Sequence, residues 1–125
     1  MQALTEQELH NLAMNIVGKE LQEAGYEFMA VNSTLKKHPQ FVCLKDKDLH
    51  FILVRAVLYP DNPHEMNAET AQKMKAHADK FEAHTYYAGV GLHNVEDPSL
   101  PLYLDTPYTV TYAGLIPVQK NISDE

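Results

Sequence analysis

The stretch His38–Val57, HPQFVCLKDKDLHFILVRAV, decides the fold. Two runs rich in Val, Ile, Leu and Phe stand on either side of a charged segment, Lys45–Asp48. Such runs are typical of β-strands, and a short charged segment between them is typical of a solvated turn. The second run is apolar throughout Phe51–Val54, which indicates a central strand buried on both faces of a sheet. The stretch therefore predicts a β-hairpin whose second strand lies inside a sheet.

A helix is predicted near the start of the chain. Thr5 and Glu8 have the spacing of a capping box, and apolar residues then recur with helical spacing until Gly25, a natural stop. We therefore expect a helix over residues 5–24. Glu20 lies near its apolar face, where it is either a flanking residue or a ligand in a site.

A second helix is predicted after the hairpin, with Asn67 as its N-cap. Two stripes at helical spacing follow this cap. The apolar stripe is Ala71, Met74, Ala78 and Phe81, and the charged stripe is Lys73, His77, Lys80 and His84. A charged stripe is usually a solvated helix face, and the alternative is a binding surface.

The remaining strands are predicted at 26–31, 85–92 and 108–118. The sequence AGVG at 88–91 is interpreted as a point of close packing within a strand rather than a phosphate loop. The order is then one helix, three strands, a second helix and two strands. This order predicts an α/β fold, on the border with α+β, in which two helices flank a central mixed sheet.

Length and charge restrict the function. The 125 residues suit one domain, with a core over about 5–118 and a polar tail at 119–125. The formal charge of −7 disfavours nucleic acid as a partner, because the surface as a whole repels phosphate. The chain shows neither a secretory signal nor a membrane span, so a cytoplasmic protein is expected. Cys43, the single cysteine, is expected to be buried and unreactive.

The predicted order of elements resembles the core of the PD-(D/E)xK superfamily, the restriction-endonuclease-like fold. A small bacterial single-domain branch of this superfamily opens with a helix, a Gly-aromatic pair, a short strand and an Asn. Gly25-Tyr26 and Asn32 stand here with matching spacing. The resemblance covers about residues 5–115 and is more specific in spacing than in residue type.

The resemblance also assigns the motif positions. Its Asp falls on Gln40, preceded by Pro39 as in the motif, its Glu falls thirteen residues later on Leu53, and its Lys falls on Arg55. The first-helix acid of some relatives falls on Met14. All three acidic positions of the motif are therefore occupied by residues without a carboxylate.

These replacements bear on the chemistry that the resemblance implies. In such nucleases the Asp and Glu hold Mg²⁺ against the scissile phosphate, and the Lys supports the developing charge. Leu53 cannot ligate a metal, and Gln40 offers only a neutral amide oxygen. Arg55 keeps a positive charge that clamps anions but does not act as a base. We therefore expect a protein that is not an enzyme, that needs no cofactor and that acts by contact with an unknown protein partner or as a homodimer.

One alternative is a divalent-metal-dependent nuclease with rebuilt ligands. Glu20 and His38 are the candidate ligands beside Gln40, and only this hypothesis requires Mg²⁺.

Another alternative is a non-cleaving binder of nucleic acid or other anions. It depends on Arg55, with Lys73 and His77 of the second helix near it.

Overall fold

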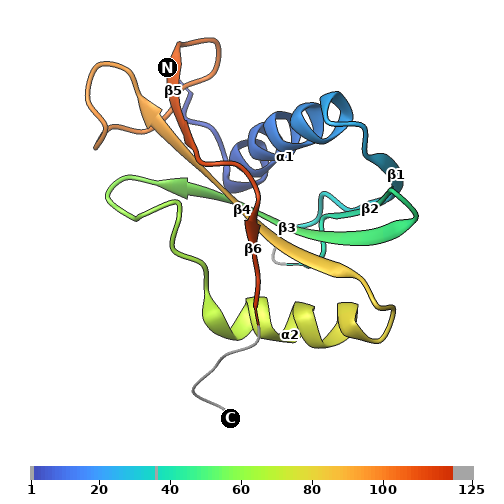
Figure 1. Cartoon of the computed structure of the whole chain (residues 1–125). Helices are drawn as coiled ribbons and strands as arrows, with labels where there is room; N and C mark the ends of the chain where they lie inside the picture. Colours follow the sequence, from blue (N-terminus) through green and yellow to red (C-terminus); the bar gives the residue numbers. More distant parts are fainter. Residues whose placement is uncertain (1, 36, 120–125) are drawn as a thin grey trace.

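The computed structural model describes residues 2–35 and 37–119 (Figure 1). The chain forms a mixed six-stranded sheet with two helices. The elements in chain order are α1 Glu6–Glu23, β1 Glu27–Val31, β2 Phe41–Lys45, β3 Asp48–Leu58, α2 Ala68–Asp79, β4 His84–Asn94, β5 Tyr108–Tyr112 and β6 Ile116–Pro117. The predicted α/β class with a central mixed sheet is confirmed.

The sheet has the order β1-β2-β3-β4-β5, and β6 pairs with β4 beside β5. Only the β3–β4 pair is parallel, because α2 makes the crossover between these two strands. The hairpin predicted from His38–Val57 is β2–β3, and both residues at its tip, Asp46 and Lys47, have positive φ values (53° and 72°). A charged two-residue turn thus takes the place of the usual glycine-containing one.

The two helices cover opposite faces of the sheet (Figure 1). Side chains of β3 alternate between these faces, as the two-residue period of a strand requires. Ile52 and Val54 pack in the core beneath α1, whereas Leu53 packs with Met74 of α2. The prediction that β3 is buried on both faces is therefore confirmed.

The caps of both helices are as predicted. The Thr5 hydroxyl accepts from the Glu8 amide, and the Glu8 carboxylate accepts from the Thr5 amide. The Asn67 side chain accepts from the Thr70 amide. Cys43 is fully buried in the core beneath α1, as expected.

The second helix ends earlier than its stripes suggest. Lys80 is the C-cap, so Phe81 lies beyond α2 and is 54% exposed rather than buried. His84 begins β4, where its ring faces the Asp48 carboxylate, and it therefore does not extend the charged face of α2. The prediction is wrong here because the helical spacing of the apolar and charged residues continues by chance through the turn after Asp79.

The single last strand predicted at 108–118 is also wrong. It is divided into β5 and β6 by a segment that contains Gly114, whose φ is 86°. A positive φ of this size turns the chain out of the strand conformation. Most of the polar tail predicted at 119–125 lies outside the described residues.

Gly89 and Gly91 of β4 confirm the interpretation of AGVG as a packing point. Both glycines pair with β3 and face the α2 side, where a Cβ atom on either would press against Pro63. Pro63 is thereby seated directly on the sheet, which fixes the β3–α2 loop. Within the described ranges, no helix is long and apolar enough to cross a membrane.

Candidate functional site

Gln40 lies fully buried just before β2 and links three segments of backbone. Its Oε1 accepts from the Val54 amide at 2.7 Å, and its Nε2 donates to the Lys37 carbonyl. The backbone amide of Gln40 donates to the Ile52 carbonyl at 2.9 Å. The side chain therefore replaces strand pairing at the point where β2 begins, and both its oxygen and its nitrogen are already hydrogen-bonded to protein atoms.

Arg55 projects from β3 beside Gln40. Its Nη1 donates to the Val54 carbonyl (2.8 Å), the Lys37 carbonyl (3.3 Å) and Gln40 Oε1 (3.3 Å). In the part of the chain that the structure describes, neither Nη2 nor Nε has an acceptor and no carboxylate pairs with the guanidinium. Arg55 is the only arginine of the sequence, and among the described residues one of its three side-chain nitrogens has protein acceptors while the other two have none.

The other motif-equivalent positions are apolar and buried. Leu53 lies on the α2 face in one cluster with Met74 and Tyr87, and the same face carries Arg55 two residues further along β3. Met14 packs on the opposite face, beneath α1. Leu53 and Arg55 thus share the α2 face of the sheet, Gln40 bonds to the backbone of β3 beside them, and Met14 lies on the opposite face.

His38 lies near several basic side chains. Its pKa is lowered first by burial and then by the charges of Arg55, His77, Lys73 and Lys37. Its Nδ1 is buried without a hydrogen-bond partner among the described residues. The structure therefore brings Lys73 and His77 of α2 to the same side of the molecule as Arg55, as the anion-binding hypothesis expects.

Glu20 does not join this group. Its Oε1 accepts a 2.8 Å hydrogen bond from the Tyr112 hydroxyl of β5, on the α1 face. Burial and this bond raise the pKa of Tyr112 strongly. A site built from Glu20, His38 and Gln40 is thus not formed, and no group of three or more His, Cys, Asp or Glu side chains among residues 2–35 and 37–119 is placed to hold a metal.

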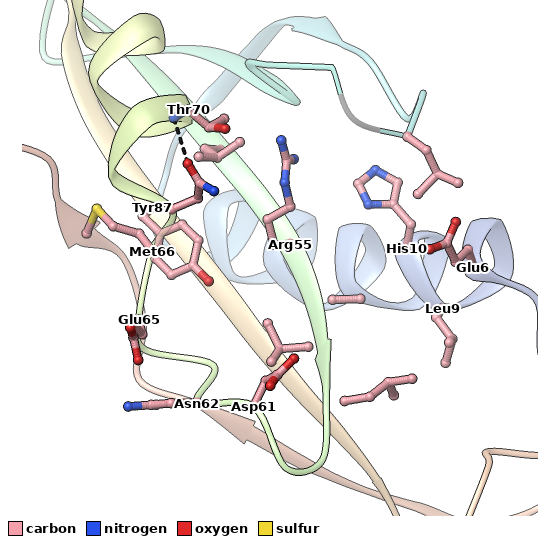
Figure 2. A pocket seen from close by; sticks show the side chains of 16 residues that line it. Glu6, Leu9, His10, Arg55, Asp61, Asn62, Glu65, Met66, Thr70 and Tyr87 are labelled. Carbon is pink, nitrogen blue, oxygen red and sulfur yellow. Dashed lines mark hydrogen bonds between the residues drawn. The ribbon is translucent and has the colours of Figure 1, made fainter.

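A cleft of about 710 Å³ opens beside Arg55 (Figure 2). It lies between the first turns of α1, the end of β3 and the β3–α2 loop. Leu53, Leu58 and Met66 supply apolar walls, and Thr70 leads from the cleft along α2 to Lys73 one turn further on. The residue equivalent to the motif's Glu, Leu53, therefore forms part of a cleft wall.

His10 of α1 is a residue of this cleft that the sequence reasoning missed. It is only 2% exposed, and its Nε2 has no partner among the described atoms. Burial lowers the pKa of His10, and the charge of Arg55 lowers it further, so both factors favour the neutral ring. A signal was present, because His10 precedes the buried Ala13 and Val17 by three and seven residues and so lies on their face of the helix.

The fold and the cleft define a small α/β domain with a cleft marked by one arginine and one buried histidine. The chain belongs to the family described as domain of unknown function (DUF8840), whose model matches residues 7–118. The match includes His10, Gln40 and Arg55. Neither the curated proteins nor the solved structures contain a match to the chain.

Proposed function

We propose that this protein is a non-catalytic, restriction-endonuclease-like domain of the cytoplasm that binds an anionic group at Arg55. The observation that carries the proposal is the state of the guanidinium. Nη1 is fixed by three protein oxygens, while Nη2 and Nε have no acceptor within the described residues. Two adjacent N–H groups of this kind match the two oxygens of a carboxylate or phosphate.

The charges around Arg55 support an anion. Lys37, Lys73 and His77 all act on His38 with the same sign as Arg55. Lys73 is exposed, and its ion-pair partner among the described residues is Glu69 of its own helix (3.0 Å), which is also exposed, so water screens the interaction. Basic side chains are therefore grouped near Arg55 on a chain whose formal charge is −7.

The absence of catalysis is proposed from the residues at the motif positions. Leu53 is an apolar wall, and both ends of the Gln40 amide are bonded to the protein. The alternative nuclease with ligands from Glu20 and His38 is not supported, since Glu20 bonds to Tyr112 on the other face. No cofactor is needed for anion binding by Arg55.

Calorimetric titration with pyrophosphate and with a short single-stranded oligonucleotide tests the proposal. We expect pyrophosphate to bind, and we expect Arg55→Gln to weaken binding at least tenfold. The matched control is Lys19→Gln, which removes one positive charge from the exposed side of α1. Equal binding by both variants, or Mg²⁺-dependent cleavage of the oligonucleotide, would overturn the proposal.

A second candidate function, self-association, is favoured by the edge of the sheet. β1 is an edge strand, and its Phe28, Met29 and Val31 are 38%, 56% and 58% exposed. An exposed apolar edge invites a further strand. Analytical ultracentrifugation of the protein and of Val31→Lys tests this role: a dimer that the substitution dissociates supports it, and a monomer at high concentration contradicts it.

A further inference from the structure

The size and walls of the cleft indicate a small organic ligand. Clefts that hold such molecules usually measure 300–1,000 Å³ and combine apolar walls with a few polar groups. The cleft beside Arg55 is about 710 Å³, and more of its lining is apolar than polar. A bare inorganic anion would leave the walls formed by Leu58 and Met66 without contact.

His10 provides a second polar group for the same ligand. A buried ring nitrogen without a partner destabilises the protein unless something supplies a hydrogen bond. His10 lines the cleft, and its proximity to Arg55 is evident from the effect of that charge on its ring. Figure 2 shows the two side chains extending in the same direction at one end of the cleft. A neutral imidazole donates from one nitrogen, so His10 and Arg55 together suit one anionic head.

The acidic residues of the cleft argue against a long polyanion such as nucleic acid. Asp61 and Glu65 lie on the β3–α2 loop, and Glu6 lies on the first turn of α1. In Figure 2 the two loop carboxylates stand apart from Arg55, toward the opposite end of the cleft. A chain of phosphates passing through the cleft would meet the carboxylates of Asp61 and Glu65, whereas a ligand whose single anionic group lies at Arg55 would not.

We propose that the cleft binds a small organic anion with an apolar body, whose single carboxylate or phosphate head lies against Arg55 and His10. The inference rests on the proposed anion binding at Arg55 and specifies its ligand. The apolar body lies along Leu53, Leu58 and Met66. Arg55 binds the single negative head, and the carboxylates of Asp61 and Glu65 repel the further negative charges of a nucleic acid.

The test compares anions that share a head but differ in body. NMR titration of the full chain is carried out with inorganic phosphate, phenyl phosphate, acetate and benzoate. We expect at least one aromatic anion to bind at least fivefold more tightly than its small counterpart. A preference within the phosphate pair assigns a phosphate head, and a preference within the carboxylate pair assigns a carboxylate head. Equal affinity within both pairs overturns the inference.

Two variants locate the bound molecule. Leu58→Gln changes a partly exposed wall and should remove the preference for the aromatic member of the pair. His10→Leu should weaken the preferred anion at least threefold, whereas His64→Leu, at an exposed histidine of the β3–α2 loop, should leave it unchanged. Near-ultraviolet circular dichroism shows that each variant is folded.

The two proposals fail in different ways. In one outcome, Arg55→Gln abolishes anion binding, but aromatic and small anions bind equally and neither Leu58→Gln nor His10→Leu changes their affinity. The small-ligand inference is then wrong, and the proposal of anion binding at Arg55 stands. If Arg55→Gln has no effect on any anion, both are wrong.

Discussion

Arg55 Nη1 and Gln40 Oε1 are joined at 3.3 Å, and the same Gln40 oxygen accepts from the Val54 amide at 2.7 Å. The neutral side-chain amide of Gln40 therefore positions the only arginine of the sequence. It also takes the place of a backbone hydrogen bond between β2 and β3 at the point where β2 begins. A carboxylate at position 40 could accept these same bonds, but it could not donate to the Lys37 carbonyl as the Gln40 amide does. The residue that stands in place of an expected metal ligand thus has a structural role.

Gln40→Ala should destabilise the protein by about 2–4 kcal/mol, because it leaves the buried Val54 amide without its acceptor and removes one of the two donors to the Lys37 carbonyl. The free energy of unfolding, measured in urea, gives this value. Gln22→Ala, the same change at an exposed position of α1, should shift it by less than about 0.5 kcal/mol. Similar effects for the two variants would contradict the structural role of Gln40.

Gly89→Ala should destabilise the protein by about 1–3 kcal/mol, because the new methyl group would overlap the Pro63 carbonyl oxygen and the Tyr87 hydroxyl. These two atoms are hydrogen-bonded at 3.0 Å, and they anchor the loop that forms one wall of the cleft. Gly91→Ala should cost less, since its nearest contacts are side-chain carbons at 3.1 and 3.2 Å. Urea unfolding of the two variants checks the order, and a larger loss for Gly91→Ala would contradict it.

The parts of the fold that the sequence predicts are those with a local cause. The capping box at Thr5, the Asn67 cap and the hairpin strands follow from neighbouring residues, and each is observed. The end of α2 and the break at Gly114 depend on how the chain packs against the sheet. Periodicity alone extends past both points, which is why the burial of Phe81 and a single last strand were predicted wrongly.

The candidate site was predictable only in part. Arg55, Gln40 and Leu53 could be found from strand spacing, because all three belong to one hairpin. The approach of Lys73 and His77 could be suggested but not located, since it depends on the angle at which α2 crosses the sheet. His10 and the loop residues Asp61 and Glu65 come from distant segments, and nothing local marks their meeting in one cleft.

Glu20→Gln should leave anion binding unchanged and should weaken the core beneath α1. The charged acceptor of the Tyr112 hydroxyl is replaced by a neutral one, so a loss of about 1 kcal/mol is expected. Tyr112→Phe should cost a similar amount, and the double variant little more, because both changes act on the same bond: the first weakens it and the second removes it. Tyr108→Phe, at an exposed tyrosine of the same strand, is the control. A loss of pyrophosphate binding in Glu20→Gln would instead assign Glu20 to the site.

Cys43 should be unreactive toward a thiol reagent in the folded protein. Burial raises the pKa of its thiol to about 11, so thiolate is scarce at about pH 8, and the sulfur has no access to solvent. Absorbance during reaction with an aromatic disulfide should rise slowly in buffer and at once in concentrated urea. Rapid reaction in buffer would show that the β2–β3 region opens easily.

Acidification should destabilise the protein before its carboxylates titrate. Burial lowers the pKa values of His10, His38 and His50 below 6.5, their value in the unfolded chain. In the window between the folded and unfolded pKa values the unfolded state binds more protons than the folded state. The contribution of these histidines to the free energy of unfolding is therefore fully present above about pH 6.5 and is lost as the pH decreases through this window.

Urea midpoints at about pH 7.5 and about pH 5.5 measure the loss. His10→Gln should reduce the difference between the two midpoints, because it removes one histidine that must be neutral in the folded state, and His64→Gln should not. An unchanged difference in His10→Gln would show that His10 accepts a proton without cost, and that it is not the buried, unpartnered group of the cleft.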